Sequence, residues 1–172
     1  MSDLLTPQHK TLLEYWRLRA GRKALPSRED IRPEDVPSLL KHLGLIDVVH
    51  GNDRLRFKYR LVGTQMSFVL GKDVTGTWLH ELKFGEYRDY LDALFSEAVT
   101  MRRPVYSHTE FGYADNRRLE VKRLIMPLSA DGEAVNMLLF SNLFHSDDAD
   151  FGHRPYPPGE ILDFSEGDRR AA

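Results

Sequence analysis

Seven histidines are the side chains best suited to acid–base or metal chemistry in this chain, which contains no cysteine. None of them forms an H-x-x-x-H or H-E-x-x-H pair, so a helical metal site is not predicted. His80 stands beside Glu81 and near Asp73, a set that can pair a base with an orienting carboxylate, although a loop surface is the alternative. His108 lies within a predicted strand and can ligate haem or line a pocket. A small enzyme using His108 or His80 is therefore one of three functions considered.

Sequence motifs of the common enzyme classes are missing. The chain has no G-x-S-x-G elbow, no Walker-type phosphate loop and no G-x-G-x-x-G. Asp147, Asp148 and Asp150 resemble a calcium loop but lack its glycine and its distal glutamate. Without cysteine there can be no cysteinyl-flavin adduct and no thioester-linked chromophore. We expect no catalytic residues, no metal site and no haem, and the identity of any cofactor stays unknown.

Charge and hydropathy exclude two classes of partner. The formal net charge is −2, with acids and bases intermixed along all 172 residues, so no strong attraction to phosphate backbones is expected. No apolar run approaches the roughly 18 residues that a transmembrane helix requires. The opening "MSDLLTPQHK" lacks the basic and apolar regions of a signal peptide. We therefore expect a cytoplasmic protein that binds no nucleic acid and does not insert into membranes.

The first half of the chain predicts a helix followed by a hairpin. "HKTLLEYWRLRAGR" places Leu12, Leu13, Trp16 and Ala20 on one side of an amphipathic helix. "LGLIDVV" and "RLRFKYRLVG" have the period of two that is typical of strands, and the turn "HGND" joins them. Alternation in the second strand separates an apolar face from a basic one. The apolar face is Leu55, Phe57, Tyr59 and Leu61, and the basic face is Arg56, Lys58 and Arg60.

Helices and then three more strands are predicted in the second half. Short helical turns after Gly63 bury Met66 and Phe68, and "GEYRDYLDALFSEAVTMR" is a longer helix. The strands are "PVYSHTEFGY", "RLEVKRLIMPL" and "AVNMLLFSNLF". In the second of these the apolar parity changes at Lys122–Arg123, which predicts a β-bulge.

These elements predict an α+β fold. Five antiparallel strands carry short helices on one face, with a longer connecting helix and an N-terminal amphipathic helix. We expect an N-terminal helical flank at 1–42, a core at 43–146 and a largely irregular tail at 147–172.

Five segments in this order resemble a known family. They are "LLEYWRLRAGRKALPSREDIRP", "LLKHLGLIDV", "FKYRLVGT", "GKDVTGTWLHEL" and "MPLSADGEAVNMLL", within residues 10 to 145. The chain resembles a PAS domain, in particular the PAS_5 subfamily found largely in alphaproteobacteria. The resemblance implies a sensory or regulatory module with a five-stranded sheet around short helices. Many such domains hold a small molecule between the sheet and the helices, whereas others are empty and serve as dimerisation surfaces.

The resemblance also implies how such a module would act. The chain contains no kinase, cyclase or helix-turn-helix sequence, so a stand-alone module would signal through protein–protein contact. The leading prediction is a small molecule bound in the core cavity. The alternative is a ligand-free interaction module whose core is filled by its own side chains. The predicted cavity residues are Tyr59, Leu61, Met66, Phe68, Leu91, Leu94, Phe95, His108, Arg123, Met126 and Met137.

A homodimer and an unidentified regulatory protein are the predicted partners. Large aromatic side chains on an amphipathic helix are typical interface anchors, and a basic sheet face offers a docking surface. The predicted interface residues are Leu12, Tyr15, Trp16, Arg56, Lys58 and Arg60.

Overall fold

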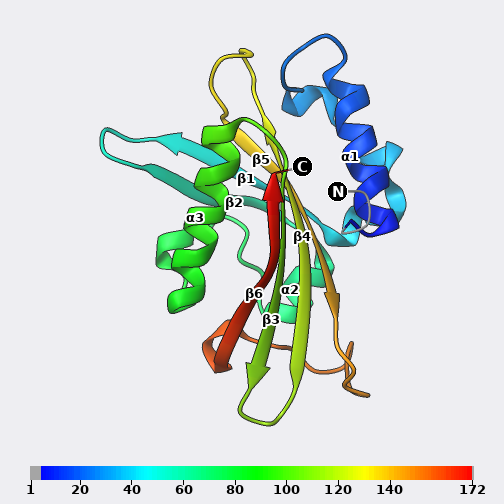
Figure 1. The fold of residues 1–172 in the computed structure, drawn as a ribbon, viewed down its shortest axis with the longest axis vertical. Helices are drawn as coiled ribbons and strands as arrows, with labels where there is room; N and C mark the ends of the chain where they lie inside the picture. The colour runs from blue at the N-terminus through cyan, green and yellow to red at the C-terminus, as the bar shows by residue number, and fades with distance from the viewer. Residues whose placement is uncertain (1–4, 172) are drawn as a thin grey trace.

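The computed structural model describes residues 5–171, apart from the side chains of residues 159 and 168, and shows one six-stranded antiparallel sheet with helices on both faces (Figure 1). The sheet order is β2-β1-β5-β4-β3-β6. The strands are β1 (Leu43–His50), β2 (Leu55–Val62), β3 (Val105–Tyr113), β4 (Arg118–Leu128), β5 (Met137–His145) and β6 (Ile161–Ala171). The α-helices are α1 (Pro7–Ala20), α2 (Thr64–Leu70) and α3 (Glu86–Met101). The short 3₁₀ helices are η1 (Arg28–Asp30), η2 (Pro33–Asp35), η3 (Pro37–His42), η4 (Leu79–Glu81) and η5 (Pro158–Glu160). The predicted α+β class is confirmed.

Helix α1 covers one face of the sheet, which we call the outer face, and α3 covers the opposite, inner face (Figure 1). The Thr6 side chain accepts a hydrogen bond from the His9 backbone N–H and caps α1. Leu12 and Trp16 are buried, and the Trp16 indole N–H donates to the Pro127 carbonyl oxygen at 3.1 Å. The apolar stripe of α1 is therefore buried within its own chain. None of the helices in residues 5–171 is long and apolar enough to cross a bilayer.

A β-bulge in β2 changes which residues of the hairpin face the core. Leu45 pairs with Leu61 but Ile46 pairs with Tyr59, so Arg60 is an extra residue in β2. The extra residue reverses the alternation, and Leu61 moves to the outer face, where its side chain is 52% exposed. The prediction that Leu61 lines the inner cavity is wrong for this reason.

The bulge predicted in β4 does not occur. The register of β4 against β3 and against β5 is continuous through Lys122 and Arg123. The apolar residues appear on both parities because α1 and α3 cover both faces of this strand. Arg123 and Ile125 therefore face inward, whereas Met126 faces outward beneath α1.

The tail contributes a sixth strand, so the predicted five-stranded sheet is one strand short. Strand β6 pairs antiparallel with β3 at the edge of the sheet. The Phe164 ring lies 5.9 Å from the Tyr87 and Phe111 rings and 5.8 Å from the Tyr90 ring, measured between centroids. The prediction of a largely irregular tail is wrong for residues 161–171. The reason is that this polar strand is stabilised largely by backbone pairing with β3. Residue types alone predict such pairing poorly. The boundary predicted between residues 42 and 43 stays a prediction.

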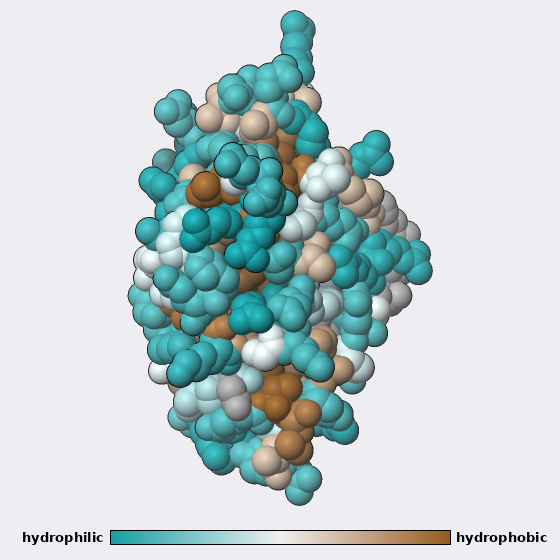
Figure 2. Space-filling model, turned by 90° about the vertical axis from the view of Figure 1, so that its left-hand side faces the viewer, coloured by the Kyte–Doolittle hydropathy of each residue, from teal (hydrophilic) through white to brown (hydrophobic). Residues whose placement is uncertain are grey.

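The surface around this core is mainly hydrophilic on the face seen in Figure 2, where hydrophobic side chains emerge in separate patches. The core itself runs on both sides of the sheet. It includes Leu94, Leu124, Ile125, Met126 and Leu138, which are all fully buried.

Candidate functional site

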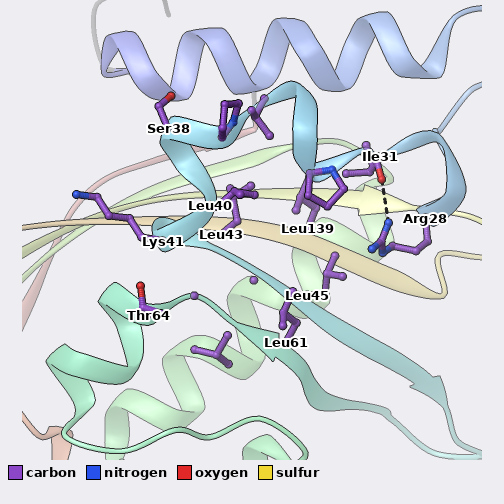
Figure 3. A pocket seen from close by; sticks show the side chains of 16 residues that line it. Arg28, Ile31, Ser38, Leu40, Lys41, Leu43, Leu45, Leu61, Thr64 and Leu139 are labelled. Atoms are coloured by element: carbon purple, nitrogen blue, oxygen red, sulfur yellow. Dashed lines mark hydrogen bonds between the residues drawn. The ribbon is translucent and has the colours of Figure 1, made fainter.

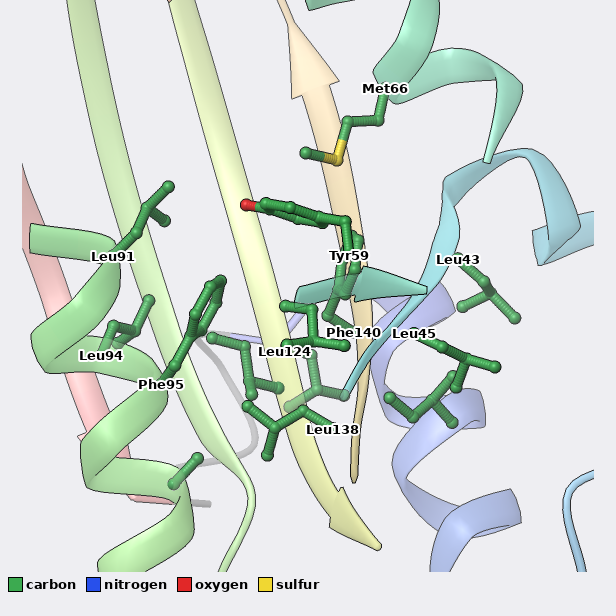
Figure 4. Close-up of a cluster of buried hydrophobic side chains, with 14 of the residues drawn as sticks. Leu43, Leu45, Tyr59, Met66, Leu91, Leu94, Phe95, Leu124, Leu138 and Phe140 are labelled. Carbon is green, nitrogen blue, oxygen red and sulfur yellow. The ribbon is translucent and has the colours of Figure 1, made fainter. Parts of the chain in front are cut away.

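A small cavity of about 30 Å³ lies on the inner face, between the sheet and helices α2 and α3. In Figure 4, Leu91 and Phe95 on α3 lie on one side of this core, with Tyr59 and Met66 facing them from β2 and α2. Tyr59, Leu91 and Phe95 lie on elements whose periodicity is visible in the sequence, so their approach was predictable. The cavity is lined by Tyr59, Met66, Leu70, Phe84, Tyr87, Leu91, Phe95, Arg123, Ile125, Phe140, Asn142 and Phe144.

Two glycines allow α2 to lie over the cavity. At Gly63, between β2 and α2, an added Cβ would be 2.5 Å from the Lys41 carbonyl oxygen and 2.6 Å from that of Leu43, so only glycine fits beside this backbone. Gly71 ends α2 with a φ of 73°, a left-handed conformation that favours glycine. The chain can therefore leave β2, make one short helix and return above the sheet.

Among the described residues that line the cavity, Arg123 alone is charged, and it is almost completely buried, at 1% exposure. Its Nη1 donates to the Thr109 hydroxyl at 2.8 Å, and its Nη2 donates to the Tyr87 hydroxyl. Its Nε has no hydrogen-bond partner in the part of the chain that the structure describes. The guanidinium lies 5.3 Å from the centre of the Tyr87 ring and 5.9 Å from that of Phe111.

None of the carboxylates whose side chains the structure describes pairs with this guanidinium. Its hydrogen-bond partners are neutral hydroxyls, and no carboxylate is within ion-pair distance of it in the described chain. Burial raises the pKa of the Tyr59 phenol and of the Tyr87 phenol, so neither supplies a phenolate at neutral pH. A guanidinium keeps its proton in proteins. The cavity therefore contains a buried positive charge that the described residues leave without a counter-charge.

Asn142 adds a second unsatisfied polar group to the same cavity. It stands directly opposite Arg123 in the β4–β5 pair, and its side chain is 7% exposed. Its Nδ2 donates to the Met66 sulfur at 3.5 Å, whereas its Oδ1 has no partner among the described residues. A cationic donor and a free amide acceptor therefore lie side by side on one face of the sheet.

Five of the predicted cavity residues meet at this site, namely Tyr59, Met66, Leu91, Phe95 and Arg123. Two others lie near it without lining it. Leu94 is buried in the core beside it, and Phe68 is half-buried on α2.

His108, Met126 and Met137 do not face the cavity. In the β-ladders these residues share the outer face with Leu124 and Leu139. The His108 Nε2 lies 2.9 Å from Glu120 Oε1 on that face. The prediction that these three residues line the pocket is wrong, and His108 does not face the cavity in which haem ligation by it was considered.

The other proposed catalytic set does not assemble either. His80 is exposed on η4, with its ring centre 5.9 Å from that of Trp78. The Glu81 carboxylate accepts from the Trp78 backbone N–H, and the Asp73 carboxylate accepts from Thr75. Both carboxylates accept hydrogen bonds from nearby backbone N–H groups and neither pairs with His80 in the described residues, so the geometry does not support an enzyme that uses His80.

Sequence reasoning missed several residues of the site, of which Tyr87 and Asn142 matter most. Tyr87 precedes Leu91 and Phe95 at intervals of four on one side of α3, which is a detectable signal. Asn142 is the single amide in the inward series Leu138, Phe140, Asn142 and Phe144 of β5. A polar residue within such an apolar alternation indicates a functional position.

A second hollow lies at the surface on the outer side of the hairpin. This groove, of about 470 Å³, runs between η3, β1 and the start of α2, and Leu61 points into it (Figure 3). Leu40 and Leu61 line it and are 42% and 52% exposed. Arg28 and Lys41 lie toward opposite sides of it, and Arg28 Nη1 donates to the Ile31 carbonyl oxygen at 2.9 Å.

The residues predicted for an interface make contacts within the chain. Leu12 and Trp16 are buried between α1 and the sheet, and the Tyr15 hydroxyl lies 3.1 Å from the Asp35 carboxylate. The guanidinium of Arg56 stacks on the Trp78 ring at 4.4 Å, and the Lys58 ammonium is 5.5 Å from the same ring. Arg60 forms an ion pair with Asp47 at 3.2 Å. Leu12 and Trp16 are thus unavailable to a second copy in this structure, since α1 already covers its own sheet.

Comparison with known proteins agrees with this architecture. The sequence profile of PAS_5, described as a PAS domain, matches residues 5–140. The chain belongs to the PAS_5 family of PAS domains. No curated protein sequence matches this PAS domain.

Among solved structures, this PAS domain is similar to VqmA from Vibrio cholera, in a crystal structure of a VqmA–ligand–DNA complex. The two chains are 16% identical, with a TM-score of 0.46. The match covers 72% of this chain and 56% of VqmA, so the chain spans a little more than half of that structure. This distant similarity does not carry ligand or DNA binding over to the PAS domain described here.

Proposed function

We propose that this PAS domain is a cytoplasmic sensory module that binds a small molecule in its inner cavity and signals through contacts with another protein. One observation carries the proposal. Arg123 Nε and Asn142 Oδ1 are unsatisfied polar atoms on two buried side chains that line one cavity. Buried polar groups in folded proteins nearly always have partners, and each one left alone costs about 1–3 kcal/mol. A domain that needs only a filled core gains nothing from such a pair.

A ligand-free interaction module is the second candidate, and the size of the cavity favours it. A volume of about 30 Å³ is room for roughly two water molecules. A larger ligand would have to displace side chains. Met66, on the short helix α2, is the lining residue best suited to move, because its unbranched side chain adapts to different shapes.

Output through protein contact is the second part of the proposal. We expect a homodimer or a complex with a regulatory protein, formed through surfaces other than the buried stripe of α1. The net charge of −2 supports the expectation that this PAS domain does not itself bind nucleic acid. Size-exclusion chromatography with light scattering tests the homodimer. A mass of twice 19.9 kDa is expected at high micromolar concentration, and a monomer there would remove the homodimer.

The ligand is tested by thermal denaturation in the presence of small-molecule fractions from cells that make the protein. A ligand at one hundred times its Kd stabilises the fold by about 2.7 kcal/mol, which for a domain of this size raises Tm by roughly 5–10 °C. Met66→Trp fills the cavity and should abolish the shift. Met101→Trp adds the same bulk at an exposed position on α3 and should retain it. If no fraction stabilises the unmodified domain, the ligand-free module becomes the better description.

A further inference from the structure

The charge and hydrogen-bonding pattern of the inner cavity specify the class of ligand, if the cavity binds one as proposed above. We propose that the ligand is a small carboxylate with a hydroxyl group, or an equivalent hydrogen-bond donor, beside the carboxylate. The carboxylate would meet Arg123 and the donor would meet Asn142, which faces it across the β4–β5 pair.

The negative charge follows from the surroundings of Arg123. Arg123 is 1% exposed, its guanidinium donates to the neutral hydroxyls of Thr109 and Tyr87, and its Nε has no partner among the side chains that the structure describes. Buried charges in proteins are normally paired, because an isolated ion loses its hydration without compensation. A carboxylate oxygen supplies both the missing charge and an acceptor for Nε, and guanidinium–carboxylate hydrogen bonds are among the strongest in proteins.

The donor follows from Asn142. The Nδ2 of this amide is already engaged with the Met66 sulfur, so the atom left over is the acceptor Oδ1. A carboxylate alone would leave Oδ1 unsatisfied and would place a second acceptor beside it. A hydroxyl on the neighbouring carbon would donate to Oδ1 while the carboxylate stays at Arg123.

The size of the ligand is limited by the cavity. The free volume of about 30 Å³ admits roughly two water molecules, so only a few heavy atoms fit before lining residues move. Apart from Asn142 and the phenol hydroxyls of Tyr59 and Tyr87, the rest of the described lining is apolar, as at Phe95, Phe140 and Phe144, and it carries no second charge. A compact monocarboxylate fits this lining better than a dicarboxylate, a phosphate ester or an extended cofactor.

Three related compounds test the assignment on the full chain. Glycolate has both groups, acetate has only the carboxylate, and glycolamide has the hydroxyl without the charge. Each is titrated into ¹⁵N-labelled protein while backbone amide shifts are followed, with sodium chloride holding the ionic strength constant. Glycolate should bind at least about tenfold more tightly than glycolamide, and about twofold to tenfold more tightly than acetate.

Two variants assign each preference to its residue. Arg123→Met should remove the preference for glycolate over glycolamide. Asn142→Leu should remove the preference for glycolate over acetate and keep the preference for glycolate over glycolamide. Arg56→Met, which removes a cation from the outer face, should leave both preferences unchanged. The spectrum of each variant shows directly whether it folds.

Several results would overturn the ligand class. Glycolamide binding as well as glycolate would do so, and so would a preference that survives in Arg123→Met, or shift changes confined to the outer face. Saturation of the site by chloride alone would indicate a simple anion site instead. If none of the three compounds binds but a cellular fraction still raises Tm in a Met66-dependent way, the class is wrong and the sensory function stands. If none of the three compounds binds and no cellular fraction raises Tm, the ligand class and the sensory function both fail.

Discussion

Replacement of Arg123 in the ligand-free domain is the sharpest test of the unpaired charge. The native side chain makes two hydrogen bonds from a charged donor, each contributing about 1.5–3 kcal/mol. Against them stands the loss of hydration of a charge with no counter-charge among the described residues, which costs several kcal/mol. The two contributions are similar in size and opposite in sign. Arg123→Met, which keeps the length and removes the charge, should therefore change the free energy of unfolding by no more than about 1.5 kcal/mol.

A second buried arginine provides the matched control. Arg117 is 8% exposed, and its Nε lies 2.7 Å from the Asp115 carboxylate. Its Nη1 donates to the Pro155 carbonyl oxygen at 2.8 Å, and its guanidinium lies 4.2 Å from the centre of the Tyr156 ring. Arg117→Met leaves that carbonyl without its donor and removes the ring contact, so it should cost about 2–3 kcal/mol.

Urea unfolding followed by circular dichroism measures both variants. The proteins are first unfolded and refolded in a buffer without carboxylates, so that any bound ligand is removed. A loss of 3 kcal/mol or more in Arg123→Met would refute the reasoning, because removing one member of a compensated buried pair costs that much. It would show that the guanidinium is already paired in the ligand-free state.

Three further predictions concern the scaffold around the site. Burial lowers the pKa of His9 to about 4 from its ordinary value of 6.5, so below pH 6.5 the unfolded chain takes up a proton that the folded chain does not. Stability should therefore fall by up to about 3 kcal/mol between pH 6.5 and 4, and denaturant titrations of His9→Gln should lack this contribution. Gly63→Ala should lose at least about 2 kcal/mol in the same assay, because the new Cβ would lie 2.5 Å from the rigid backbone oxygen of Lys41; near-native stability would contradict the close approach. Phe164→Ala should lose about 1–2 kcal/mol and should speed hydrogen exchange in β3, since the half-buried ring packs on Tyr87; unchanged exchange would show that β6 does not hold the edge.

Periodicity in the sequence was sufficient for the elements that carry most of the site. The alternation of β2 placed Tyr59 inward, and the helical spacing of α3 placed Leu91 and Phe95 on its inner side. The same alternation failed at Leu61, because the bulge at Arg60 depends on pairing with β1 and leaves no mark on the apolar pattern.

The sequence could not predict which face each residue occupies in strands that are covered on both faces. Met126 is apolar and fully buried whichever face it occupies, so its type cannot reveal that it lies beneath α1. His108 lies on the same outer face, beside Glu120. Strand β6 escaped detection because polar residues alternate with few apolar ones at a sheet edge. Asn142 was detectable, since it interrupts an apolar alternation, and attention to such interruptions would have found the site more completely.

Native mass spectrometry of the protein purified from cells that make it tests the central claim most directly. We predict a non-covalent adduct of small mass on the folded protein, lost on denaturation and absent from Met66→Trp, while Met101→Trp keeps it. The bare polypeptide mass in every sample, or an adduct that persists in Met66→Trp, would contradict a ligand in the inner cavity.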